Sequence, residues 1–163
     1  MKSNTNRITV PEVTPKELIA RVEQELDLGY VEAALRTWDF MRGELGRTFE
    51  ALTLHSYARR SALRDIQSES IRLHAEGNTA AWLVWLIQNK ERILSDNQQA
   101  TYSTIPPYER RFREQPPHSK VWCGPVLFQS SGRWGLWLVD LDQSSPKPRT
   151  WGRNDIVVTF RNR

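Results

Sequence analysis

Hydrophobic residues recur every three or four positions through the first part of the chain, which is the spacing of an amphipathic helix. The spacing predicts four helices, over about residues 14–28, 30–42, 48–76 and 79–94. Thr14 is a typical N-cap for the first helix, and Pro15 suits its first turn. We expect Gly29 to end that helix in a left-handed conformation. The pattern therefore predicts an N-terminal helical bundle.

The longest apolar run in the chain is Ala80–Ile87, eight residues long. A helix that is hydrophobic on every side is buried in the interior of its protein. We therefore expect the 79–94 helix to be the central one. The run is much shorter than the roughly 18 residues needed to cross a bilayer, so no membrane contact is expected.

The hydrophobic period changes to two in the last part of the chain, which indicates strands. Three strands are predicted, over about residues 120–128, 133–142 and 156–160. Residues 130–132, Ser-Ser-Gly, are typical of a turn between the first two. Gly124-Pro125 favours an edge position or a bulge for the first strand. In the third strand, Val157 and Thr159 are expected to face solvent. Short loops between successive strands predict an antiparallel meander.

The glycine spacing and alternation of residues 132–141, followed by 154–158, resemble the middle of a small SH3-like barrel. This resemblance implies strands that close into a barrel, and a meander packed on the helices is the alternative. The predicted fold class is therefore α+β, with a bundle of about four helices followed by a small antiparallel three-stranded sheet or SH3-like barrel. The expected organisation is a disordered or extended N-terminus over 1–13, a helical subdomain over 14–94, a basic Pro-rich linker over 95–118 and an antiparallel β subdomain over 119–163.

Positive charge is concentrated toward the end of the chain. The 163 residues include 23 Lys+Arg and 19 Asp+Glu, a net charge of +4. Residues 1–100 carry a net charge of −1, and residues 101–163 carry +5. Arginine supplies 18 of the positive charges, and guanidinium groups pair with phosphates and stack on flat rings. The last third is therefore expected to contact an anionic partner.

The single cysteine, Cys123, excludes an internal disulfide framework and a cysteine-rich zinc site. The first nine residues are polar and show no secretory signal, so a cytoplasmic protein is expected.

Reactive residues have structural explanations that are stronger than catalytic ones. Cys123 lies in a strand pattern where a buried cysteine packs as a small hydrophobe, although His118 could activate its thiol. The three histidines lack the spacing of a zinc site. Asp140 and Asp142 could hold magnesium, but pairing with arginines of neighbouring strands is favoured. The sequence contains no phosphate-binding loop or nucleophile elbow. We therefore expect no enzymatic activity and no cofactor.

Arginines alternate with aromatic residues through the last third of the chain. Flat rings stack on unpaired bases while guanidinium groups neutralise phosphates, a combination typical of single-strand binding surfaces. The predicted nucleic-acid-binding residues are Arg110, Arg111, Arg113, Lys120, Arg133, Trp134, Arg149, Trp151, Arg153 and Arg161. A secondary basic cluster consists of Arg59, Arg60 and Arg64.

These features predict a non-enzymatic accessory subunit of a larger ribonucleoprotein or nucleoprotein complex that contacts RNA or single-stranded DNA. The alternative is a protein–protein adaptor or assembly subunit without direct nucleic-acid contact. Aromatic residues and arginine are also enriched at the centres of protein interfaces, so composition alone fits both.

Replacing Arg110, Arg111 and Arg113 together with alanine is expected to weaken nucleic-acid binding, because phosphate contacts provide most of such affinity. The melting temperature is expected to stay unchanged. Titrating a short fluorescent single strand over a salt series measures the first effect, and thermal unfolding measures the second. A large fall in Tm would show that these arginines stabilise the fold instead.

Overall fold

A computed structural model describes residues 6–54, 63–96, 100–105, 123–141, 151–152 and 154–162. Over these residues the strands are β1 (Arg7–Thr9), β2 (Tyr30–Val31), β3 (Thr48–Leu54), β4 (Thr101–Ser103), β5 (Cys123–Ser130), β6 (Arg133–Asp140) and β7 (Asp155–Asn162). The helices are α1 (Pro15–Glu25), α2 (Ala33–Thr37), α3 (Leu63–Arg72), α4 (Thr79–Gln88) and α5 (Lys90–Leu94).

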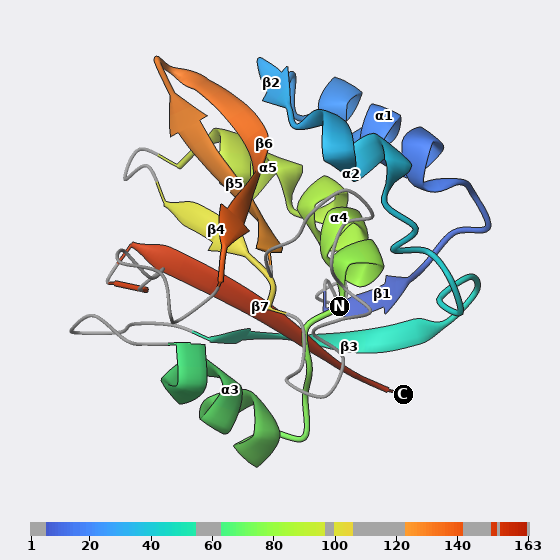
Figure 1. The fold of residues 1–163 in the computed structure, drawn as a ribbon, viewed down its shortest axis with the longest axis vertical. Helices are drawn as coiled ribbons and strands as arrows, with labels where there is room; N and C mark the ends of the chain where they lie inside the picture. The colour runs from blue at the N-terminus through green and yellow to red at the C-terminus, as the bar shows by residue number, and fades with distance from the viewer. Residues whose placement is uncertain are drawn as a thin grey trace.

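All seven strands belong to one mixed sheet, in the order β1-β3-β7-β4-β5-β6-β2. The pairs β4–β7 and β2–β6 are parallel, and the other neighbours are antiparallel. Strands from the first third of the chain therefore lie at both edges, and strands from the last two thirds lie between them. The predicted helical bundle followed by a separate three-stranded sheet is wrong, because both parts of the chain build the same sheet (Figure 1).

Two of the segments predicted to be single helices each contain a strand. The 30–42 segment contains the two-residue strand β2 and only a short helix, α2. The 48–76 segment begins with β3, which is paired on one side with β1 and on the other with β7. Those partners are distant in sequence, and strand formation depends on packing against such neighbours more than on local pattern. Local hydrophobic spacing therefore did not reveal the strands in these two segments.

The first predicted helix is confirmed at its N-terminus. The Thr14 hydroxyl accepts a hydrogen bond from the Glu17 backbone N–H at 3.2 Å, and Pro15 is the first helical residue. The left-handed residue after the helix is Asp27, with φ 48°, and not Gly29. Asp tolerates this conformation better than most residues, because its short polar side chain can hydrogen-bond locally.

Helix α4 is central, as its all-apolar sequence predicts. Seven of its ten residues are buried, and the Asn78 side chain caps it by accepting from the Ala81 N–H at 2.9 Å. It packs against α1, α5, β1 and β7 (Figure 1). Over the described residues, none of the helices has the length and apolar character needed to cross a membrane.

The sheet buries apolar residues on both faces. One core joins α1, α2, α4 and α5 to the sheet, and a second joins α3 to β3 and β7. Figure 1 shows α3 on the opposite side of β3 and β7 from α4. Because β7 lies between these layers, Val157 and Thr159 are buried, and the prediction that they face solvent is wrong.

The predicted turn between the last long strands is confirmed. Ser131 and Gly132 both have positive φ, 53° and 79°, as a two-residue hairpin between twisted strands requires. The antiparallel pairing of β5 with β6 is confirmed as well, but β5 lies between β4 and β6 and is not an edge strand. The third strand of the predicted meander, β7, pairs instead with β3 and β4. Over the described residues, the strands therefore form one open sheet with edges at β1 and β2, and not an SH3-like barrel.

Changing Gly77 to alanine is expected to destabilise the fold severely. Residues 76–78 run tightly against 104–105, and a Cβ atom on Gly77 would overlap the backbone carbonyl of Ile105. Because a backbone group cannot rotate away, the free energy of unfolding should fall by about 3 kcal/mol or more. Gly152→Ala is the matched control, since its nearest neighbour would be 3.9 Å away. Urea unfolding of both variants measures the difference, and equal stabilities would contradict the packing described.

Candidate functional site

Many of the residues predicted from sequence to bind nucleic acid lie outside the described residues. These are Arg59, Arg60, Arg110, Arg111, Arg113, Lys120, Arg149 and Arg153. His55, His118, Asp142 and the side chains of Cys123 and Asp140 also lie outside them. The structure therefore places five of the predicted residues: Arg64, Arg133, Trp134, Trp151 and Arg161.

Two of these five are core residues. Trp134 is 5% exposed and lies beside Tyr102, with 5.9 Å between the ring centroids. Trp151 is 1% exposed and belongs to the second core, with α3. Both rings are enclosed by protein, so neither is available to stack on a base. Their contribution is to the stability of the two cores.

The three arginines do not form one patch. Arg133 and Arg161 lie on β6 and β7, which β4 and β5 separate in the sheet, and Arg64 is exposed on α3. The Arg161 Nε donates to a Glu50 carboxylate oxygen at 2.8 Å, and this hydrogen bond raises the pKa of Arg161. Glu50 on β3 is paired in register with Arg7 on β1 and with Arg161 on β7. Arg161 is therefore already paired within the sheet.

The structure brings together three aromatic residues that sequence reasoning did not select. The Trp137 ring stacks on Tyr30, with centroids 4.0 Å apart and planes at 22°, and on Phe128, at 5.1 Å and 21°. We call Tyr30, Trp137 and Phe128 the aromatic stack. Its members come from the neighbouring strands β2, β6 and β5. It lies on the face of β6 opposite to Trp134 and Leu136, which point into the first core.

Gly135 leaves the space that the Trp137 ring of the aromatic stack occupies against the sheet. In register it is opposite Phe128 on β5 and next to Tyr30 on β2. A Cβ atom at this position would lie 2.7 Å from the Trp137 Nε1 and 3.3 Å from the Tyr30 Cβ. Any side chain here would therefore displace the indole ring.

A recess of about 190 Å³ opens between the aromatic stack and the β5–β6 turn. Tyr30 and Trp137 line one part of it, and Ser130, Ser131 and Arg133 line another. Pockets that enclose a whole small molecule start at roughly 300 Å³. The volume is therefore suited to a single ring or a small polar group.

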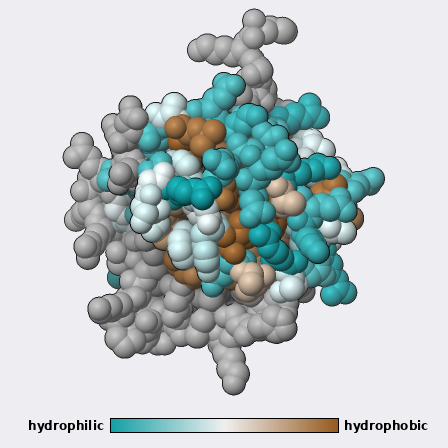
Figure 2. Space-filling model, turned by 90° about the horizontal axis from the view of Figure 1, so that it is seen from above, coloured by the Kyte–Doolittle hydropathy of each residue, from teal (hydrophilic) through white to brown (hydrophobic). Residues whose placement is uncertain are grey.

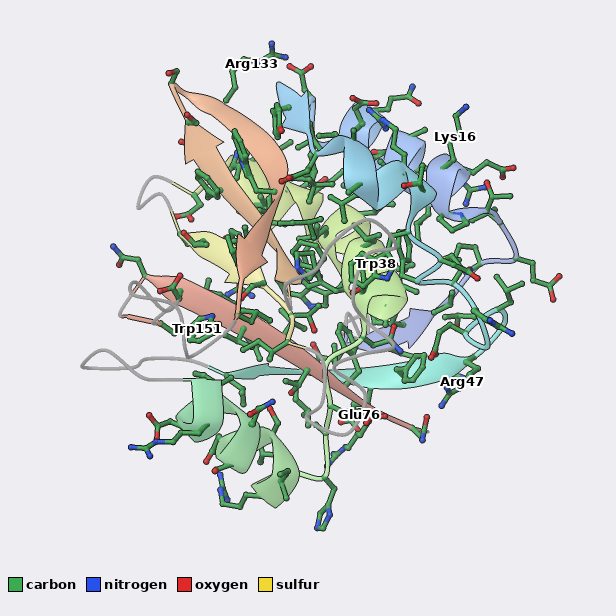
Figure 3. The ribbon with its side chains drawn as sticks, viewed as in Figure 1. Lys16, Trp38, Arg47, Glu76, Arg133 and Trp151 are labelled. Atoms are coloured by element: carbon green, nitrogen blue, oxygen red, sulfur yellow. The ribbon has the colours of Figure 1, made fainter. Side chains whose placement is uncertain are left out.

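The Arg133 side chain lies at the rim of this recess. It is 60% exposed, and its Nη2 is 3.6 Å from an Asp27 carboxylate oxygen. It passes over Gly29, where an added Cβ would be 3.1 Å from the Arg133 Nε. Figure 3 shows Arg133 at the end of the β5–β6 hairpin, well away from Arg47 and Glu76. Seen from above, the coloured part of the surface is mainly hydrophilic, with several hydrophobic areas among the hydrophilic residues (Figure 2).

Sequence reasoning identified Arg133 but missed Tyr30, Phe128 and Trp137. Side chains alternate between the two faces of a strand, so the sequence of β6 alone places Trp137 on the face opposite to Trp134. This alternation is the sequence signal that points to Trp137. Tyr30 could not be found in that way, because its position depends on a parallel pairing with a strand about one hundred residues later.

Within the described part of the chain, no group of three or more His, Cys, Asp or Glu side chains is arranged to hold a metal ion.

Comparison with protein-family models, with curated proteins and with solved structures finds no significant match to this chain.

Changing Gly135 to alanine is expected to break the contact between Tyr30 and Trp137. The added methyl would push the indole off the sheet and lower the free energy of unfolding by about 1–3 kcal/mol. The stacked rings should contribute to the near-UV circular dichroism, and that contribution is identified by its absence in Trp137→Phe. We expect Gly135→Ala to lose the same bands while the far-UV spectrum is kept. An unchanged near-UV spectrum would contradict the role given to Gly135.

Proposed function

We propose that this protein is a non-enzymatic accessory subunit that contacts RNA or single-stranded DNA within a larger nucleoprotein complex. In this proposal an unpaired base stacks at the exposed end of the aromatic stack and a neighbouring phosphate pairs with Arg133. The observation that carries it is the position of a solvent-exposed ring, a ring-sized recess and a guanidinium group side by side.

Tyr30 supports the stacking part of the proposal. It ends the aromatic stack, and 43% of the residue is exposed although Trp137 covers one face of its ring. Every base has a flat face, so stacking is tolerant of sequence and contributes roughly 1–3 kcal/mol per base. Because the Tyr30 ring is held by Trp137, it would lose little freedom on binding.

Arg133 supports the phosphate part of the proposal. In a single strand each base is linked to a phosphate within one nucleotide, and Arg133 lies at the rim of the recess beside Tyr30. Guanidinium groups bind phosphate oxygens through two parallel hydrogen bonds. The net charge of +5 over residues 101–163 would add a longer-range attraction for a polyanion.

Other aspects of the proposal rest on sequence alone. Other protein subunits would be partners in the complex, and the single cysteine fits a reducing compartment such as the cytoplasm.

The Tyr30→Ala variant is expected to bind a short fluorescent single-stranded oligonucleotide about fivefold or more weakly than the unmodified protein at low salt, because one stacked base is lost. Ile71→Ala is the matched control, since Ile71 is an exposed hydrophobic residue on α3, away from the stack. Fluorescence anisotropy measures both affinities.

Raising the salt concentration should weaken binding by the unmodified protein, and Arg133→Ala should reduce the slope of log affinity against log salt by about 1. Absence of binding at low salt, or equal affinities for the Tyr30 and Ile71 variants, would overturn the proposal. The aromatic stack would then be assigned to a protein partner, as in an adaptor or assembly subunit.

A further inference from the structure

Arg133, at the rim of the recess, has a carboxylate neighbour. The Arg133 Nη2 and the Asp27 Oδ1 are 3.6 Å apart, and the Asp27 side chain is 95% exposed. Among the described residues that line the recess, Arg133 alone carries a charge. A ligand that uses Arg133 must therefore compete with Asp27 for it.

The backbone fixes Asp27 at this position. Asp27 is left-handed, and the flanking amides donate to α1, with the Leu28 N–H bonded to the Glu23 carbonyl at 3.0 Å. Two residues later, the Gly29 N–H donates to the Trp134 carbonyl at 2.8 Å, which ties this corner to β6. The proximity of Asp27 to Arg133 is therefore set by the end of α1 and by the β2–β6 pairing.

We propose that Asp27 makes an autoinhibitory contact that limits phosphate binding at Arg133, and this inference rests on the proposed function. In the free protein the Asp27 carboxylate pairs with the Arg133 guanidinium. When a ligand binds, its phosphate replaces the carboxylate as the partner of the guanidinium. A base without a phosphate would leave the pair intact. Asp27 therefore lowers the affinity of the site for a nucleotide and leaves its affinity for a free base or nucleoside unchanged.

The exchange is feasible because the pair is exposed. Ion pairs between solvent-exposed side chains contribute little to stability, and the Asp27 carboxylate returns to water without becoming buried. A phosphodiester offers two oxygens to the guanidinium fork, so the bond formed is better matched than the single contact that is lost.

Asp27→Asn tests the inference, because Asn keeps the size of the side chain and tolerates a left-handed backbone. The variant is expected to bind the short fluorescent single strand about two- to fivefold more tightly than the unmodified protein. Glu12→Gln is the matched control. It also removes one exposed negative charge, but Glu12 lies beside Gly46, next to β1 and β3 at the other edge of the sheet. In the Arg133→Ala background, Asp27→Asn is expected to have no further effect.

The outcomes separate this inference from the function on which it rests. Tighter binding by Asp27→Asn alone, abolished in the Arg133→Ala background, supports competition for the guanidinium. If the unmodified protein binds while Asp27→Asn and Glu12→Gln have equal affinities, the inference is overturned and the proposed function stands. If none of these proteins binds the strand at low salt, both are overturned.

Discussion

Helix α4 has no polar face that could be exposed to solvent. Seven of its ten residues are buried, Trp82 and Trp85 among them, so the chain has to surround it. The helices α1 and α5 and the strands β1 and β7 supply that cover, and the strands come from opposite ends of the sequence. Burial of apolar surface is the main favourable contribution to folding, and here it requires that the first and last parts of the chain fold together.

The candidate site is a consequence of that burial. Side chains alternate between the two faces of a strand, so directing Trp134 and Leu136 of β6 toward the core around α4 directs Gly135 and Trp137 the other way. The parallel pairing of β2 with β6 then brings Tyr30 onto Trp137. The aromatic stack and the recess are therefore built on the outer face of strands whose inner face is fixed by the core, which gives the site a rigid support.

Predictions from sequence were reliable where the local signal and the tertiary environment agree. The Thr14 cap, the buried α4 and the Ser131-Gly132 turn each depend on residues that are adjacent in the chain. The prediction failed for β3, because Phe49 and Ala51 are buried in a strand between β1 and β7 whose partners lie up to about one hundred residues away. The predicted site was affected in the same way. Trp134 and Trp151 are residue types that often stack on bases, but in the folded sheet each ring is buried in one of the two cores.

The sequence alone determined which segment had to be buried, where the chain turns and where positive charge is concentrated, because these are properties of neighbouring residues. It also determined that Arg133 would stand at the end of a hairpin. Only the tertiary structure decided which strands are neighbours, and hence which rings lie together on each face. That decision depends on contacts such as Tyr30 with Gly135, and no local pattern records a pairing between segments so far apart in the chain.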